Sequence, residues 1–164
     1  MKTKWTIDIV EDNEIVRSLL KYELEKNSMY RVRTYECGEF YMLGKEKEEA
    51  DILVLDYFLD SQNKTSKDGL AILNELEKQG FAKPVIFFSG QQQLGVVIKA
   101  LKNGAVDFVS KDSDTFIEDI NLAVYQIVRK YRMHKAEILF KRNLIKGFFH
   151  FILAIGLLSL GLFI

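Results

Sequence analysis

The sequence has few of the residues that mark secreted, metal-thiolate or strongly basic proteins. Its 164 residues include one cysteine, one proline, one tryptophan and two histidines. The single Cys37 cannot form an internal disulfide, and no signal-like segment opens the chain, so we expect the N-terminal part to fold in a reducing cytoplasm. The 23 basic and 23 acidic residues leave a formal net charge of +0. Overall charge therefore gives no indication of a nucleic-acid partner, and we expect none.

Short apolar runs alternate along the chain with stretches that have helical spacing. Alternating or unbroken apolar residues predict strands over 5–10, 30–35, 51–56, 84–88 and 106–109. Apolar residues three and four apart predict helices over 14–26, 39–49, 68–80 and about 96–102, and a long helix from about 113. Such alternation predicts an α/β fold, a doubly wound parallel sheet covered by helices on both faces. The flavodoxin-like (βα)5 order 2-1-3-4-5 would place the first and third strands side by side.

Acidic residues stand where the first and third strands are expected to end. Glu11 and Asp12 follow the first strand, and Asp56 closes the run Ile52–Asp56. Taken alone, Asp56 could be an ordinary loop-capping residue. In an open α/β sheet, however, ligands bind at the carboxyl edge of the strands, so the three carboxylates are expected to converge there. Their mutual repulsion would be relieved by a cation, and a set of oxygen ligands without histidine or cysteine favours Mg²⁺.

Two further polar residues are expected at the same edge. Ser89 ends the fourth strand and Lys111 follows the fifth. With a metal on the acids, this arrangement suits phosphoryl transfer: Asp56 would be the nucleophile, and the Lys111 ammonium would hold a phosphoryl oxygen. The Ser89 hydroxyl could donate a hydrogen bond to another oxygen.

These residues together resemble the signature of the response-regulator receiver domain of two-component signalling. The matching positions are Glu11-Asp12, Asp56, Ser89-Gly90 and Asp107 to Lys111, and the resemblance covers roughly residues 4–130. It implies that Asp56 accepts a phosphoryl group from a sensor histidine kinase or a phosphotransfer protein. It also implies Mg²⁺ binding by Glu11, Asp12, Asp56 and the backbone carbonyl of Phe58.

The resemblance further implies a conformational switch rather than an enzyme with its own substrate. Ser89 would turn toward the phosphoryl oxygen, and Phe108 would swing inward with it. The signal would pass to an unknown downstream protein through the face formed by the fourth helix, fifth strand and fifth helix. A pseudo-receiver adaptor that is never phosphorylated is the alternative. An aspartate-based phosphatase is the weakest reading, because Phe58 stands where a second acid is needed.

The C-terminal part has a different composition. Basic residues crowd a helical neck expected over 131–146, and residues 148–164 carry no charge. Because about 17 apolar residues are the shortest span of a bilayer, a membrane helix is predicted over 147–164. The basic neck would then contact anionic lipid and hold a receiver domain over 1–130 at the cytoplasmic face of the inner membrane. The apolar stretch could be a tail anchor or the first part of a longer membrane protein.

Overall fold

The computed structural model describes residues 4–44, 49–59, 67–90 and 94–161, leaving out the side chains of 94, 151, 153, 154 and 157–161. By compactness the chain divides into two units, Met1–Tyr125 and Gln126–Ile164. Helix α5 (Phe116–Gly161) supplies residues to both units. The first unit contains the sheet and every candidate site residue.

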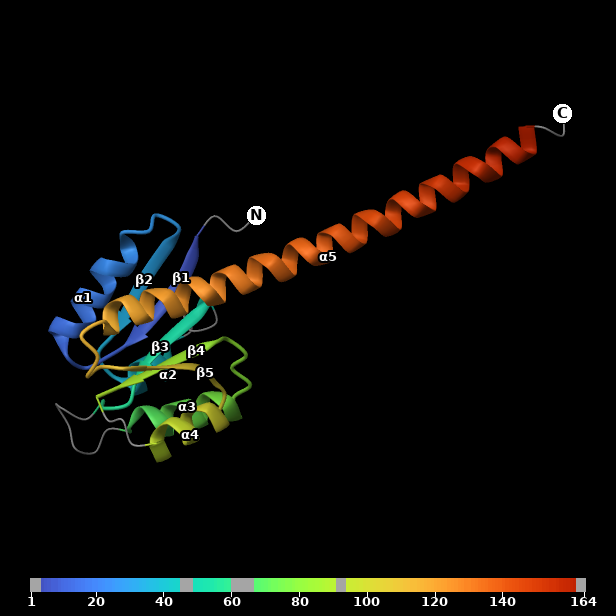
Figure 1. Ribbon diagram of the computed structural model, residues 1–164. Coiled ribbons are helices and arrows are strands. Elements are labelled where there is room, and N and C mark those ends of the chain that lie inside the picture. Colours follow the sequence, from blue (N-terminus) through green and yellow to red (C-terminus); the bar gives the residue numbers. More distant parts are fainter. Residues whose placement is uncertain (1–3, 45–48, 60–66, 91–93, 162–164) are drawn as a thin grey trace. The chain divides into compact units, whose positions relative to one another are not determined.

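The first unit is built on a five-stranded parallel sheet with the order β2-β1-β3-β4-β5, shown in Figure 1. This confirms the predicted α/β fold and strand order. The strands are β1 (Trp5–Val10), β2 (Tyr30–Tyr35), β3 (Ile52–Asp56), β4 (Val85–Ser89) and β5 (Ala105–Ser110). All five residues of β3 are buried, as its unbroken apolar run predicts.

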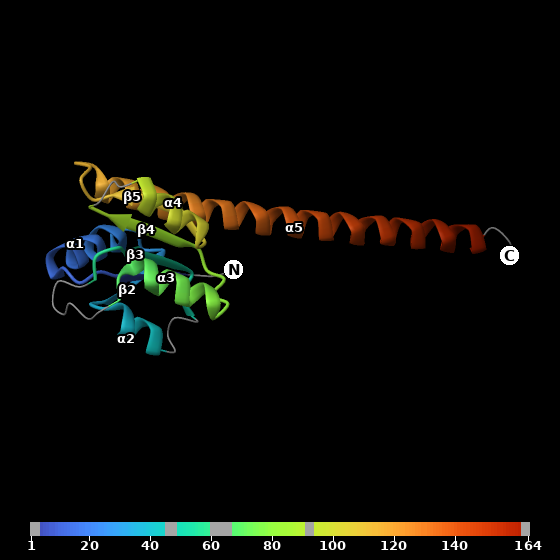
Figure 2. The ribbon, with the colours of Figure 1, turned by 90° about the horizontal axis from the view of Figure 1, so that it is seen from below.

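Helices cover both faces of this sheet. Helix α1 (Glu14–Glu25) and the start of α5 lie on one face, and α2 (Gly38–Leu43), α3 (Gly69–Lys78) and α4 (Leu94–Lys102) lie on the other (Figure 1). Figure 2 shows α3 between α2 and α4. Because both faces are covered, Asp8 in β1 is fully buried although it is charged, whereas Arg31 in the edge strand β2 is exposed.

Local sequence signals explain where several helices begin and end. The Asn13 side chain caps α1 by accepting hydrogen bonds from the amides of Ile15, 3.0 Å, and Val16, 3.2 Å. Gly104 follows α4 with φ +91°, a conformation that glycine adopts without strain. The helix predicted over 39–49 is too long, because α2 ends at Leu43 and Gly44 has an extended backbone with ψ 135°. Residues 45–48 lie outside the described residues.

A buried ion pair joins the two strands on one side of the sheet. Asp8 in β1 stands in register with Arg33 in β2 and is fully buried. The Arg33 guanidinium donates to both Asp8 oxygens, Nε to Oδ1 at 2.7 Å and Nη2 to Oδ2 at 2.9 Å. This two-pronged geometry is the strongest form of an arginine–carboxylate pair. The pair therefore holds β1 against β2 at a position three residues before Glu11.

The membrane helix predicted over 147–164 is not supported. Among the residues that the structure describes, no helix offers a stretch long and apolar enough to cross a membrane. Helix α5 ends at Gly161, and the last three residues of the predicted range lie outside the described part.

Candidate functional site

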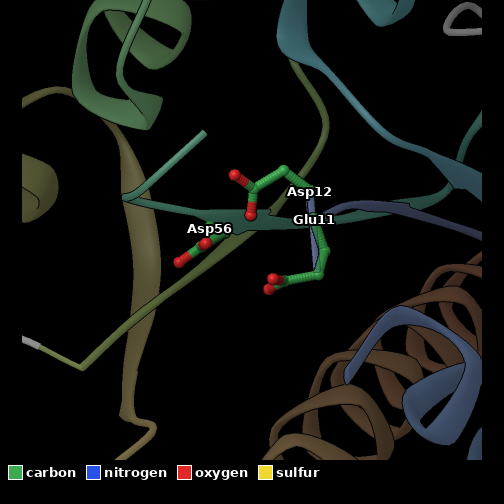
Figure 3. Close-up of side chains that lie close together, drawn as sticks. All are labelled: Glu11, Asp12 and Asp56. Carbon is green, nitrogen blue, oxygen red and sulfur yellow. The ribbon is translucent and has the colours of Figure 1, made fainter. Parts of the chain in front are cut away.

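Three carboxylates meet at the carboxyl edge of the sheet (Figure 3). Asp56 is the last residue of β3, while Glu11 and Asp12 directly follow β1; Val10 and Leu55 are partners in the β1–β3 ladder, so both strand ends reach the same level. One oxygen from each carboxylate lies within 4.8 Å of the others. All three side chains are buried, Asp12 being 8% exposed. The predicted convergence of the acids is confirmed.

Lys111 supplies the positive charge at this acidic site. Its Nζ lies 2.7 Å from Glu11 Oε2 and 2.8 Å from Asp56 Oδ2. The Phe88 ring lies beneath the ammonium, 4.6 Å from Nζ to the ring centroid. The Lys111 amide also donates to the Ser89 carbonyl at 2.9 Å, which ties the end of β5 to the end of β4. A rigid strand end thus holds the ammonium between two of the carboxylates.

Burial and repulsion shift the ionisation of the acids. Burial raises the pKa of Asp56 to about 7, and the charge of Glu11 adds to this, whereas Lys111 opposes it. Burial also raises the pKa of Glu11, again opposed by Lys111. Both carboxyl groups therefore bind protons more readily than free carboxylates do.

The donor set fits a magnesium ion. When all groups are ionised, three carboxylates face one ammonium, leaving an excess of two negative charges in a buried site. Among the described residues the site offers carboxylate oxygens and no histidine or cysteine ligand. Such hard oxygen ligands suit Mg²⁺, which keeps several waters and is commonly bound by one or two carboxylates together with phosphate oxygens. Glu11, Asp12 and Asp56 would hold the ion. The participation of the Phe58 carbonyl stays a prediction.

The remaining predicted residues lie around this edge. Ser89 is fully buried at the end of β4. Phe108 in β5 is partly buried and packs on Phe87, with ring centroids 6.4 Å apart. Phe58, 39% exposed, stacks edge-on against Tyr57 with centroids 4.7 Å apart. The positions of Ser89 and Phe108 suit the predicted switch, but their movement stays a prediction.

Arg17 orders the acidic loop, a role that the sequence did not predict. Arg17 Nη1 donates to the carbonyl oxygen of Glu11 at 2.7 Å and to that of Asp12 at 3.1 Å. One guanidinium thereby fixes the two consecutive peptide groups of Glu11 and Asp12, the acids that would hold a metal ion. Arg17 is one of several polar residues on an amphipathic helix, so nothing in its sequence position marks it.

Gly69 was also missed, and it packs directly on the backbone of Asp56. A Cβ added to Gly69 would lie 1.9 Å from the Asp56 carbonyl oxygen and 2.8 Å from the Asp56 carbonyl carbon. We expect Gly69→Ala to displace Asp56, to slow its phosphorylation and to destabilise the fold by about 1–3 kcal/mol. Urea unfolding and a phosphorylation time course measure both effects. Gly95→Ala is the control, because a Cβ at Gly95 meets nothing within 4 Å; equal behaviour of the two variants would contradict the packing argument.

The raised pKa of Asp56 also has a consequence for metal binding. Because Mg²⁺ binds the ionised carboxylate, a proton on Asp56 competes with the metal. With a pKa of about 7, the ionised fraction rises about tenfold between pH 6 and pH 8. We therefore expect the association constant for Mg²⁺, measured by calorimetry, to rise by a similar factor. An association constant for Mg²⁺ that does not change with pH would contradict competition between Mg²⁺ and a proton on Asp56. The same pH dependence in Asp56→Asn would contradict it as well.

Comparisons with known proteins agree with this geometry. Residues 7–121 match the family model of the response regulator receiver domain. Similar proteins include the C4-dicarboxylate transport transcriptional regulatory protein DctR of Rhodobacter capsulatus, 29% identical over 73% of this chain and 59% of DctR. FixJ of Rhizobium meliloti, a transcriptional regulatory protein, is 27% identical over 77% of this chain and 60% of FixJ. A protein-glutamate methylesterase of Rhodospirillum rubrum is 32% identical over 74% of this chain and 31% of that enzyme.

Solved structures show the same fold. The Francisella response regulator 1452 receiver domain superposes with a TM-score of 0.67 at 20% identity, covering 78% of this chain and 99% of that one. The BeF3-activated DrrB receiver domain gives 0.64 at 22% identity, covering 77% and 98%.

The curated relatives are longer than this chain, and the functions that their names state differ from one another. The chain spans about 60% of the length of DctR and FixJ. Because these relatives are named transcriptional regulators, the expectation of no nucleic-acid partner is not supported. Because one relative is a methylesterase, the expectation of no enzymatic activity is supported only in part. The family match over most of the chain, with its acidic residues and lysine assembled at one strand edge, shows that the protein belongs to the response regulator receiver domain family.

Proposed function

We propose that this protein is a phosphorylation switch in which Asp56 receives a phosphoryl group from a phosphohistidine on a sensor kinase or phosphotransfer protein. Receiver domains of two-component systems are phosphoacceptors that interact with sensor histidine kinases. The observation that carries the proposal is the position of Lys111, whose Nζ lies 2.8 Å from Asp56 Oδ2 in a buried acidic site. A receiver that had lost phosphorylation would have no need of this costly arrangement of buried charges.

The transfer uses groups that the chain already holds in place. An Asp56 oxygen forms a bond to phosphorus while the phosphorus–nitrogen bond of the phosphohistidine breaks, and the imidazole nitrogen keeps the bonding pair. Bound Mg²⁺ would neutralise negative charge on the phosphoryl oxygens. The Lys111 ammonium, already beside Asp56, holds a further oxygen as a point charge. The Ser89 hydroxyl, at the end of the neighbouring strand, donates to another.

The competing proposal is an adaptor that binds its partner without phosphorylation. Retention of all three acids together with Lys111 and Ser89 favours the switch, because an adaptor needs none of these groups. The two functions differ in their response to a small phosphodonor. A switch gains a phosphoryl group with acetyl phosphate and Mg²⁺, whereas an adaptor gains none.

The test is phosphorylation of the full chain with acetyl phosphate, followed by intact-mass spectrometry. We expect one Mg²⁺-dependent phosphoryl group on the wild type and none on Asp56→Asn. Asp114→Asn, which changes an exposed acid outside the site, is expected to behave like the wild type. Phosphorylation of Asp56→Asn, or none of the wild type, would reject the proposal.

The place of action in the cell stays a prediction, for which the basic and uncharged composition of the C-terminal part is the support. We propose that the switch acts at the cytoplasmic face of the membrane, where proximity to a membrane-bound kinase would raise its effective concentration. Its downstream target would be a protein that contacts the face formed by α4, β5 and α5. Fractionation of cells that produce the full chain tests the location, and recovery in the soluble fraction alone would overturn it.

A further inference from the structure

The part of α5 within the second unit carries a dense positive charge that the phosphorylation site does not use. Residues 129–146, here called the basic segment, are all exposed. This segment contains a single acid, Glu137, which pairs with Lys141 at 2.7 Å. Its cations are Arg129, Lys130, Arg132, Lys135, Lys141, Arg142 and Lys146. Seven cations and one carboxylate leave six positive charges on a helix about 27 Å long.

Large apolar side chains stand among and directly after these cations. Phe140 is 68% exposed, Leu144 63% and Ile145 70%. Charge ends at Lys146, and the next aromatic side chains, Phe148 and Phe149, are 66% and 68% exposed. These five side chains, each more than 60% exposed, lie within ten residues of one helix, whereas an ordinary surface carries its large apolar residues singly; their grouping indicates a binding function.

Nucleic acid and an anionic bilayer are the two anionic partners that the cations could bind, and the exposed apolar groups favour one of them. Nucleic acid offers phosphates, but it takes up phenylalanine rings only where bases unstack and offers no continuous apolar phase. A bilayer with anionic phospholipids offers both, because its phosphates lie directly above its acyl chains. Lysine and arginine side chains can reach phosphates while their methylene stems lie along apolar surface. Charge and apolar exposure together therefore fit a lipid surface.

We propose that the basic segment and the adjoining Phe148 and Phe149 bind the surface of membranes that contain anionic phospholipids. The cations pair with lipid phosphates, and the exposed phenylalanine rings enter the boundary between headgroups and acyl chains. This binding needs neither Asp56 nor Mg²⁺, so it stands independently of the phosphorylation proposal. It involves only side chains that the structure describes.

The test is co-sedimentation of the full chain with vesicles. We compare vesicles of phosphatidylcholine alone with vesicles that contain about one third phosphatidylserine. Since each cation contributes a factor of about five, replacing Lys141, Arg142 and Lys146 with glutamate is expected to weaken binding at least 100-fold. Phe148→Ser with Phe149→Ser is expected to weaken it too. The matched control replaces three exposed lysines of the first unit with glutamate, Lys78, Lys99 and Lys102. This control variant is expected to bind vesicles like the wild type.

The dependence of vesicle binding on salt and on lipid composition tests the proposal. Binding that requires phosphatidylserine and falls as sodium chloride is raised supports the proposal. Equal binding to both vesicles, unaffected by salt, would mean that apolar contacts act alone and would overturn it. Failure to bind either vesicle would overturn it, and so would an equal loss of binding in the control variant. Duplex DNA that displaces the chain from vesicles at equal phosphate concentration would identify nucleic acid as the preferred partner.

Discussion

Lys111→Met is expected to slow phosphorylation of Asp56 by about 100-fold or more while leaving Mg²⁺ binding in place. The ammonium lies between Glu11 and Asp56, at 2.7 and 2.8 Å, where it can stabilise the charge that develops on the transferred group. Removal of one such electrostatic donor typically costs a factor of about 100 to 1,000 in rate. All three carboxylates that would hold Mg²⁺ remain in the variant, so we expect Mg²⁺ binding to persist.

The experiment separates binding from reaction. Mg²⁺ affinity is measured by calorimetry, and the phosphorylation rate is measured with acetyl phosphate at saturating Mg²⁺. Lys67→Met, which breaks an exposed pair with Glu75, controls for the loss of a lysine. A rate within threefold of the wild type would remove Lys111 from the mechanism. A parallel loss of Mg²⁺ binding would show instead that Lys111 mainly shapes the acidic site.

Arg33→Met is expected to destabilise the protein by about 3–5 kcal/mol. The substitution leaves Asp8, which is fully buried, without the guanidinium that donates to both of its oxygens. Removing one partner of a buried ion pair costs far more than a surface ion pair contributes. Chemical unfolding in urea, followed by the fluorescence of Trp5 in β1, measures the change.

Two further variants test the cause of this loss. Replacing both partners, Asp8→Leu with Arg33→Met, is expected to recover much of the stability because no charge is left buried. Lys26→Met breaks an exposed pair with Glu23, whose lysine is 55% exposed, and is expected to cost less than about 1 kcal/mol. If the double variant were as unstable as Arg33→Met, lost packing rather than the loss of the guanidinium beside the buried Asp8 carboxylate would be responsible.

Much of the fold and most of the site can be predicted from local signals. The unbroken run before Asp56 predicts a strand buried on both faces. Alternation with helices predicts a parallel doubly wound sheet, and the flavodoxin-like arrangement of such sheets has the order 2-1-3-4-5. Once strands one and three are neighbours, the convergence of Glu11, Asp12 and Asp56 follows from geometry. Lys111 is predictable for the same reason, because it follows the last strand of the same sheet.

The remaining features depend on register and on contacts between distant segments. Asp8 and Arg33 alternate with apolar residues, a pattern typical of solvent-facing positions, and only the β1–β2 register shows that they pair. The close approach of Gly69 to Asp56 depends on how the start of α3 meets the end of β3. The end of α2 at Leu43 depends on the backbone of Gly44. None of these features has a periodic signal in the sequence.

The central claim is that Asp56 accepts a phosphoryl group in a Mg²⁺-dependent site, and beryllofluoride binding tests it most directly. Beryllofluoride mimics a phosphoryl group on a carboxylate, and ¹⁹F NMR reports the bound form. We expect the full chain to show bound fluoride resonances only with Mg²⁺, and Asp56→Asn to show none. A wild-type chain that binds no beryllofluoride at saturating Mg²⁺, or an Asp56→Asn variant that binds it equally well, would contradict the account.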